Sequence, residues 1–249
     1  GVNVSISDIS DSRSETAFNS YFLNLNYDWN EKYYLDATVR RDGSSKFAPD
    51  TRWATFWSVG AMWNIYKEKF MNEIDWINAL SLKVSYGTTG NSSIGNYAFY
   101  GLLGSGNPYN GQGTIGISQP SNYNLTWETV KSFDVGISTR LFDRLNLNVD
   151  FYDKRTENML LEIPYSYTTG FSSGYGNIGS MANTGVDIDV KVDILQGKDY
   201  YWNFRANFNY NDDRITKLFN GRDEFTLADY GLQYKVGHSS GEFWQVRYA

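Results

Sequence analysis

Carboxylates and one histidine are the residues of this chain whose types suggest catalysis. His238 is the single histidine, and the spacing supports no Ser-His-Asp arrangement around it. Asp212 and Asp213, with Asp187 and Asp189, supply the paired carboxylates that glycoside hydrolysis uses. Asp187 and Asp189 alternate with apolar residues along an expected strand, which favours solvated charges on its polar face. We predict that the chain is not an enzyme, with a glycosidase as the enzymatic alternative.

Metal, phosphate and thiol chemistry lack the residues that they need. There is no cysteine, and Asp212-Asp213 lacks the ligand spacing of a calcium-binding EF-hand. The glycine-rich stretch over residues 101–116 lacks the Lys-Ser/Thr pair of a phosphate-binding loop. A net charge of −6 and a pI near 4.9 argue against nucleic acid, which requires a clustered basic surface. We therefore expect no cofactor, no metal site and no nucleic-acid partner.

Aromatic residues offer the remaining recognition chemistry. They make up 17% of the chain, with 20 Tyr, 15 Phe and 8 Trp. Many of them fall in two expected loops, residues 88–126 and 161–178, where rings are able to stack on sugars or grip peptides. The candidate ligand contacts are Tyr97, Phe99, Tyr100, Tyr109, Tyr165, Tyr167, Phe171 and Tyr175. For each of them, packing of the loops against one another or against a partner is the alternative role.

The elements that position these loops follow from alternation of apolar and polar residues. Over residues 21–29, for example, Leu23 and Leu25 flank Asn24, which predicts a strand with one apolar face. Residues 66–78 break the alternation and suggest a helical turn. The same pattern predicts strands over residues 33–40, 53–64, 81–87, 133–141, 145–152, 186–194 and 202–210, and fainter ones over 231–236 and 243–248.

Connection lengths and aromatic positions point to a membrane. Apart from the connection over residues 66–78, short connections near residues 30, 143 and 197 alternate with long ones over 42–52, 88–126, 161–178 and 211–230. Strands of about 9 to 11 residues cross a bilayer, and Trp29, Tyr33 and Trp202 fit an interfacial girdle. We predict an all-β fold: an antiparallel up-and-down transmembrane β-barrel segment with short periplasmic turns and long extracellular loops. A soluble sandwich or propeller is the alternative.

Five stretches of sequence carry a resemblance to a known family. They are Arg40–Phe47, Trp53–Trp63, Leu82–Asn91, Asn124–Glu128 and Asn177–Gly185. Together with residues 236–238 and 243–249, they resemble the barrel of the SusC/RagA family of TonB-linked (TonB-dependent) outer-membrane proteins from Bacteroidetes-type bacteria. The stretches follow the family's order, so the resemblance covers most of the chain.

The resemblance implies a function and a larger molecule. Family members import glycan oligomers or peptides across the outer membrane, beneath a SusD-like lipoprotein lid and with energy from TonB through a plug domain. Their barrels have about 22 strands, of which this chain would supply about 8 to 10. We therefore expect residues 1–249 to be an internal barrel fragment without the plug, unstable in lipid alone because its edges are unpaired. A soluble or surface β-sandwich carbohydrate-binding module is the alternative.

Overall fold

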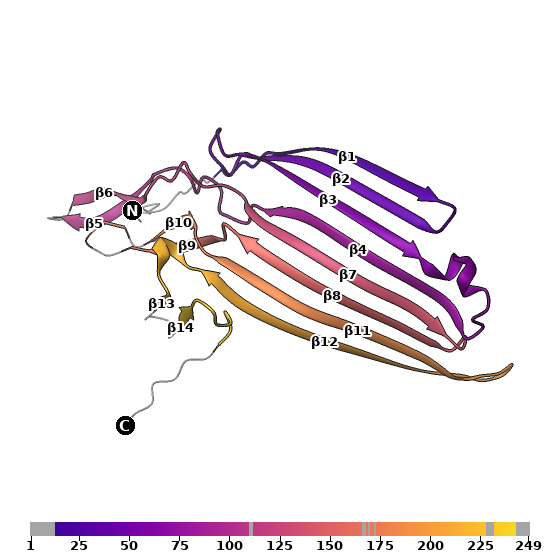
Figure 1. Cartoon of the computed structure of the whole chain (residues 1–249). Coiled ribbons are helices and arrows are strands. Elements are labelled where there is room, and N and C mark those ends of the chain that lie inside the picture. The colour runs from indigo at the N-terminus through magenta and orange to yellow at the C-terminus, as the bar shows by residue number, and fades with distance from the viewer. Residues whose placement is uncertain are drawn as a thin grey trace, which may run out of the picture.

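One antiparallel sheet of eight strands dominates the computed structural model (Figure 1). The structure describes residues 13–109, 112–165, 168, 170–171, 173–227 and 232–242. The strands pair in the order β1-β2-β3-β4-β7-β8-β11-β12, and every pair is antiparallel. Their bounds are Phe18–Trp29 (β1), Tyr33–Ser44 (β2), Trp53–Asn64 (β3), Ile77–Asn91 (β4), Glu128–Leu141 (β7), Leu145–Glu157 (β8), Ser180–Gln196 (β11) and Tyr201–Lys217 (β12). The up-and-down order is confirmed, and the sheet is open, with β1 and β12 at its edges.

The eight clearest predicted strands are confirmed, and all of them except β3 are longer than the alternation indicated. β11 and β12 each have 17 residues, whereas the apolar alternation extends only over residues 186–194 and 202–210. The pairing continues because backbone hydrogen bonds do not depend on side-chain polarity. The strands therefore project beyond the apolar band at the end of the sheet that carries the long connections, here called the loop end.

Three small two-stranded sheets lie at the loop end. They pair β5 (Leu102–Tyr109) with β6 (Gln112–Gln119), β9 (Leu160–Pro164) with β10 (Ser173–Asn177), and β13 (Glu224–Leu227) with β14 (Leu232–Lys235). The expected long loops thus contain hairpins, because short neighbouring strands satisfy each other's backbone groups locally. The expectation of a ninth strand in the main sheet over residues 231–236 is wrong, since β14 pairs with β13. The faint strand over residues 243–248 lies outside the described residues.

Tight turns close the opposite end of the sheet, here called the turn end. Asn30 and Glu31 have φ of 53° and 55°, and Phe142 and Asp143 have φ of 53° and 56°. Two consecutive residues with positive φ form the turn whose twist matches that of the flanking strands. The strain at Phe142 is offset by its ring, which stacks on Trp76 at 5.7 Å.

A polar network explains the one long connection at the turn end. Two short 3₁₀ helices, η1 (Ile65–Lys67) and η2 (Lys69–Met71), confirm the predicted helical turn. Glu68 between them accepts hydrogen bonds from Tyr33 Oη at 2.7 Å, Lys32 Nζ at 3.0 Å and Trp63 Nε1 at 3.2 Å. These hydrogen bonds, that of Tyr33 foremost, hold the pKa of Glu68 below its usual value. The network fixes the connection onto the ends of β2 and β3.

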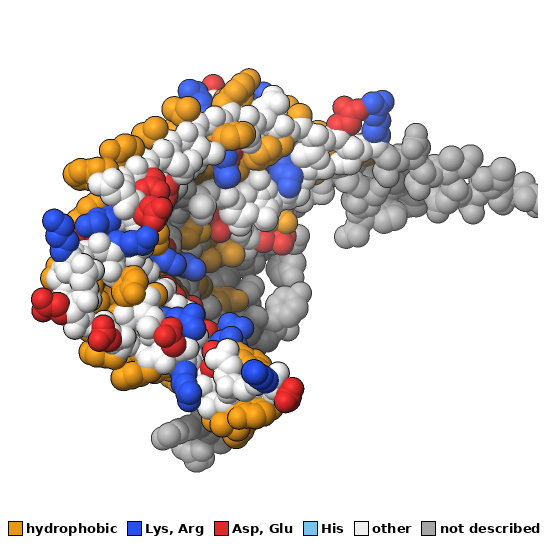
Figure 2. All heavy atoms as spheres, turned by 90° about the vertical axis from the view of Figure 1, so that its right-hand side faces the viewer, with side chains coloured by type: hydrophobic (Ala, Val, Ile, Leu, Met, Phe, Trp, Pro, Cys, Tyr) orange, Lys and Arg blue, Asp and Glu red, His pale blue; other side chains and the backbone are white. Residues whose placement is uncertain are grey.

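Alternation sorts the side chains onto two different faces. Viewed from the turn end, the sheet is curved, and hydrophobic side chains gather on its convex face (Figure 2). The pairing register aligns one apolar residue from each strand into a continuous row. That row is Tyr27, Leu35, Ala61, Val84, Val135, Phe151, Val186 and Tyr210. Among the described residues, no helix has the length and apolar character needed to cross a membrane.

The neighbouring row on the concave face is polar or small. It runs Asn26, Asp36, Gly60, Ser85, Asp134, Tyr152, Gly185 and Asn211. Its glycines make room for larger partners: a Cβ at Gly60 would lie 2.7 Å from an Asp36 carboxylate oxygen, and one at Gly185 would meet the Tyr152 ring and, at 2.5 Å, the Tyr210 carbonyl oxygen. Side chains converge on the inside of a curved sheet, so the missing Cβ atoms permit the curvature.

Gly185→Ala tests whether this close approach is required. In the complete gene product, we expect the substitution to cost about 1–3 kcal/mol of stability, because the new methyl overlaps backbone that cannot move away. The readout is the temperature at which the folded electrophoretic band of the detergent-solubilised protein converts to the unfolded band. Gly95→Ala is the matched control, since a Cβ there meets nothing within 4 Å. Equal transition temperatures for the two variants would contradict the account.

Candidate ligand-binding site at the loop end

The main buried core of the chain lies at the loop end rather than within the long sheet. Phe56 of β3 points onto the concave side, and connecting segments fold over it. The Trp127 ring lies 5.3 Å from that of Phe47 and 5.7 Å from that of Phe56. The full cluster is Phe47, Ala48, Phe56, Ile94, Ala98, Phe99, Leu125 and Trp127. Three connections that are far apart in sequence are thereby packed into one unit, here called the loop core.

Hydrogen bonds from side chains to backbone fix the loop core. Trp127 Nε1 donates to the Arg52 carbonyl oxygen at 2.9 Å, and Thr51 Oγ1 donates to the Leu125 carbonyl oxygen at 2.6 Å. The Arg52 carbonyl oxygen also accepts from the Ser44 amide at 3.1 Å, so the Trp127 ring joins an existing backbone hydrogen bond, whereas Thr51 satisfies the Leu125 carbonyl. The loop that follows β2 is thus attached to the segment that leads into β7.

Asn177 makes the most complete of these attachments. Its side-chain oxygen accepts from the Thr126 amide at 2.8 Å, and its Nδ2 donates to the Thr126 carbonyl at 2.7 Å and the Asn158 carbonyl at 3.0 Å. The Asn177 side chain therefore makes the pair of hydrogen bonds to the Thr126 backbone that a residue on a neighbouring strand would make. Glu128 adds a second attachment, because it accepts from Asn91 Nδ2 at 3.2 Å and the Leu160 amide at 3.1 Å.

The predicted ligand contacts divide into exposed and buried residues. Tyr97 and Tyr100 are 41% and 44% exposed, whereas Phe99 is only 2% exposed and belongs to the loop core. The rings of Phe99 and Tyr100 lie 4.0 Å apart, so Phe99 supports Tyr100 from below. Exposure leaves Tyr97 and Tyr100 available to a ligand, while the surface does not present Phe99.

Three further candidates, Tyr165, Phe171 and Tyr175, lie on the β9–β10 side of the loop end. Tyr165 is exposed and makes an edge contact with Phe171 at 6.1 Å. Tyr175 is partly buried against the loop core. Tyr109 lies in β5, but its side chain is outside the described part of the chain, as is Tyr167 altogether. The structure thus brings the candidates together in two groups and not in one.

Nothing in the sequence indicated that a cation, Arg52, lies beside Tyr97 and Tyr100. An open cavity of about 680 Å³ is lined by Arg52 and Ser45 together with Tyr97 and Tyr100. Arg52 Nε is buried, and within the described residues it has no hydrogen-bond partner. Guanidinium and phenol groups side by side are able to bind carboxylates, carbonyls or hydroxyls while a ring covers an apolar surface. In the sequence, the segment that contains Arg52 was notable only because it lies between Arg40–Phe47 and Trp53–Trp63, two stretches that resemble the family.

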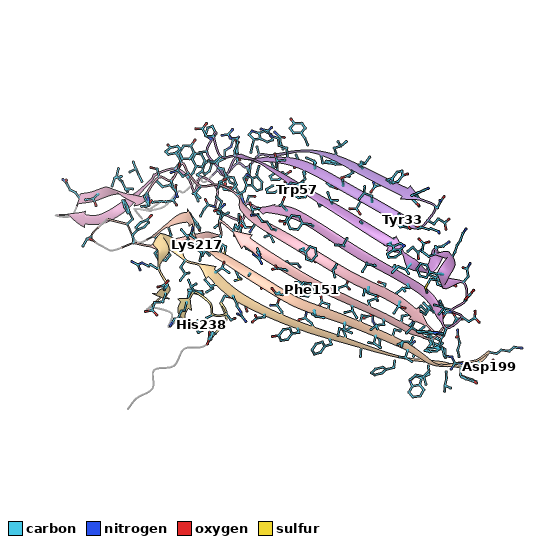
Figure 3. The ribbon with its side chains drawn as sticks, viewed as in Figure 1. Tyr33, Trp57, Phe151, Asp199, Lys217 and His238 are labelled. Atoms are coloured by element: carbon cyan, nitrogen blue, oxygen red, sulfur yellow. The ribbon has the colours of Figure 1, made fainter. Side chains whose placement is uncertain are left out.

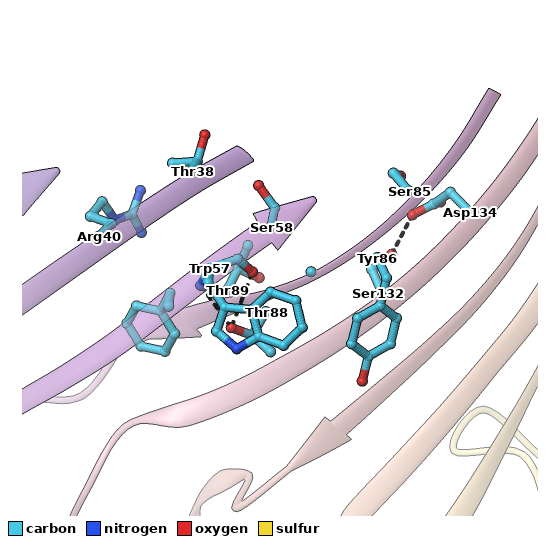
Figure 4. A pocket seen from close by; sticks show the side chains of 12 residues that line it. Thr38, Arg40, Trp57, Ser58, Ser85, Tyr86, Thr88, Thr89, Ser132 and Asp134 are labelled. Atoms are coloured by element: carbon cyan, nitrogen blue, oxygen red, sulfur yellow. Dashed lines mark hydrogen bonds between the residues drawn. The ribbon is translucent and has the colours of Figure 1, made fainter. Parts of the chain in front are cut away.

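A second cavity, lined by hydroxyl, charged and aromatic side chains, lies farther along the concave face (Figure 4). Its volume is about 250 Å³, and its lining includes Thr38, Ser58 and Ser85. Ser132 Oγ donates to Asp134 Oδ2 at 2.7 Å within it. Hydroxyls and charges of this kind suit a wetted surface that a polar molecule passes.

The comparisons with known proteins decide between a membrane wall and a soluble sheet. The family model of the TonB dependent receptor-like β-barrel matches residues 2–249. The chain belongs to this family. Its barrels are outer-membrane proteins, so the convex face lies against lipid and the concave face lines the lumen. The loop end is extracellular, and the turn end is periplasmic.

Named relatives agree with this assignment. The chain is 34% identical over 229 residues to TonB-dependent receptor P39 of Formosa agariphila, which covers 92% of the chain and 22% of the relative. It is 30% identical over 245 residues to TonB-dependent receptor SusC of Bacteroides thetaiotaomicron. This alignment covers 90% of the chain and 24% of the relative. The chain thus spans about a quarter of the length of the curated relatives that it matches. These relatives are receptors and not enzymes by name.

Solved structures show the same barrel segment. The RagAB peptide importer in its closed-closed state superposes with a TM-score of 0.84 at 43% identity, covering 90% of this chain and 25% of that chain. The siderophore receptor PirA from Pseudomonas aeruginosa reaches a TM-score of 0.55 at 14% identity, over 80% and 32% of the two chains. The second likeness shows the fold alone. The resemblance to SusC/RagA proteins is confirmed.

Asn177→Ala tests the attachment of the extracellular loops. In the complete protein on intact cells, we expect faster proteinase K cleavage within the extracellular connections over residues 92–127 and 158–179. The reason is that two Thr126 backbone groups lose their partner, at a cost of about 1–3 kcal/mol. Asn72→Ala on the periplasmic connection is the control, because that exposed side chain makes no hydrogen bond within the described residues. Cleavage of both variants at the unmodified protein's rate would contradict the role of Asn177.

Proposed function

We propose that this chain forms part of the wall of a TonB-dependent importer for peptides or glycan oligomers. A SusD-like lipoprotein covers the extracellular end in this proposal, and TonB supplies energy through a plug domain outside residues 1–249. The observation that carries it is the placement of an aromatic and cationic cavity at the extracellular mouth of a polar concave face. Relatives described as SusC and as the RagAB peptide importer support it.

Two rival functions find no support in the geometry. A carbohydrate-binding sandwich needs a second sheet over the apolar convex face, and within the described residues no sheet covers that face. A glycosidase needs two carboxyl groups directed at a bound sugar, whereas Asp189 is directed at Arg205 Nε, at 3.0 Å, and Asp213 at the Ser240 amide, at 2.9 Å. We propose that the protein is a transporter component without enzymatic activity.

The exposed aromatic pair provides the test of ligand binding. We expect Tyr97→Ala combined with Tyr100→Ala to weaken ligand binding by the complete importer about 10-fold or more, because stacked rings at a binding surface contribute about 1–3 kcal/mol. The probes are a defined peptide library and a defined oligosaccharide library, with bound species quantified by native mass spectrometry.

Tyr66→Ala is the matched control for this double variant, because Tyr66 is similarly exposed but lies on the periplasmic connection. Unchanged affinity of the double variant for every bound species would remove Tyr97 and Tyr100 from the site. Absence of binding to either library by the unmodified importer would overturn the proposed function itself.

A further inference from the structure

Two apolar residues interrupt the polar concave face near its extracellular end. Met181 of β11 and Ile215 of β12 are direct register partners. They lie on the same face as Asn211 and Asp213, because alternate residues of a strand share a face. Ile215 is nevertheless only 6% exposed. A lumen-facing apolar pair at this level requires a covering structure or an apolar ligand.

A cavity of about 350 Å³ lies over this pair. Its other apolar walls include Met159, Leu161 and Phe219. The walls come from four segments of the chain: the entry into β9, the connection from β10 to β11 with the start of β11, the end of β12 with the residues after it, and β14 with the segment that follows it. Figure 3 shows Lys217 near this position on β12 and His238 on the segment that follows β14.

Backbone contacts build the cavity without a ligand. Gly179, at φ of 86°, would carry a Cβ only 2.9 Å from the Lys217 carbonyl oxygen, so glycine permits the close approach of β12. The Ile178 amide donates to the Met159 carbonyl at 2.8 Å. On the other side, the Ile215 amide donates to the His238 carbonyl at 2.9 Å. The walls are therefore held in place from both sides.

The volume and the lining indicate what the cavity would hold. Native packing leaves few voids larger than a water molecule, whereas pockets for ligands begin near roughly 300 Å³. Two methionines line it, and their flexible thioethers adapt to apolar groups of different shape. Glu162, Lys217 and Ser240 contribute the polar groups of the lining. A sugar presents hydroxyls that a methionine and leucine wall cannot satisfy, but a large aliphatic or aromatic side chain fits such a wall.

We propose that this cavity is a selectivity pocket for a large apolar side chain of a peptide ligand. The inference rests on the proposed import function and selects peptides over glycans as its substrate class. Glu162 and Lys217 meet the peptide backbone around the side chain that enters. The pocket is lined from β9, β11 and β12, whereas the cavity beside Tyr97 and Tyr100 adjoins the ends of β1 to β3 at the other edge of the sheet. The two would therefore contact different parts of the same ligand.

The experiment uses the complete importer and a defined peptide library, with bound peptides identified by mass spectrometry. The unmodified protein is expected to enrich peptides containing Leu, Met or Phe at least threefold over the input. Leu161→Asp places a charge on the wall at a position that is 41% exposed, and should abolish the enrichment. Met181→Phe fills the cavity and should shift the bound set toward smaller side chains.

Leu103→Asp is the control, because Leu103 is 72% exposed on β5 and does not line this cavity. It should keep the enrichment. The proposal is overturned if the unmodified protein shows no preference for large apolar residues, or if both pocket variants keep it while remaining heat-modifiable barrels. Binding of oligosaccharides but not peptides would overturn the pocket and leave the import function standing, whereas binding of neither would remove both.

Discussion

The structure depends on one constraint: every backbone amide and carbonyl that faces lipid must find its partner within the protein. Unsatisfied groups in hydrocarbon cost several kcal/mol each, and a continuous antiparallel ladder removes them. The pairing from β1 to β12 does so strand by strand. Once the ladder is set, the alternation fixes which side chains face lipid and which face the lumen. A shift of the pairing by one residue would turn the polar row toward lipid.

The extracellular end follows from the same ladder. The strands continue past the apolar band, and near the loop end they present Phe56, Asn91 and Glu128 to the connections. The loop core packs on Phe56, while Asn177 and Glu128 attach loops to strand ends. The sheet that faces lipid therefore carries extracellular connections that are packed on it and hydrogen-bonded to it. Preorganised loops of this kind bind a ligand without first losing conformational entropy.

The repetitive part of this structure could be predicted from the sequence, and the contacts among the loops could not. Alternation over residues 145–152 or 202–210 is a local signal, so the strands and their faces were predictable. Asn177 and Thr126 lie 51 residues apart, and nothing local indicates that they meet. Both residues lie in stretches that resemble the family, but the resemblance gives no physical reason for their presence. The structure supplies that reason, because the two residues are hydrogen-bonded to each other.

Single residues show the same limit. Phe99 was indistinguishable from Tyr97 and Tyr100 as a loop aromatic, and only the fold buries it. Arg52 was missed because an arginine in a loop is ordinary until its surroundings are known. Met181 and Ile215 left no signal either, because both lie outside the alternating stretches over residues 186–194 and 202–210. Only the pairing register places the two apolar residues side by side on the concave face.

The most direct test of the account is the environment of two adjacent residues on β4. Val84 belongs to the convex row and Ser85 to the concave row. Val84→Cys and Ser85→Cys, each carrying a nitroxide in the complete protein reconstituted in bilayers, report collision with oxygen in lipid and with a water-soluble nickel complex. We predict dominant oxygen accessibility for the label at position 84 and relatively greater nickel accessibility at position 85. Equal accessibilities, or the reverse order, would contradict a wall with lipid on one face and the lumen on the other.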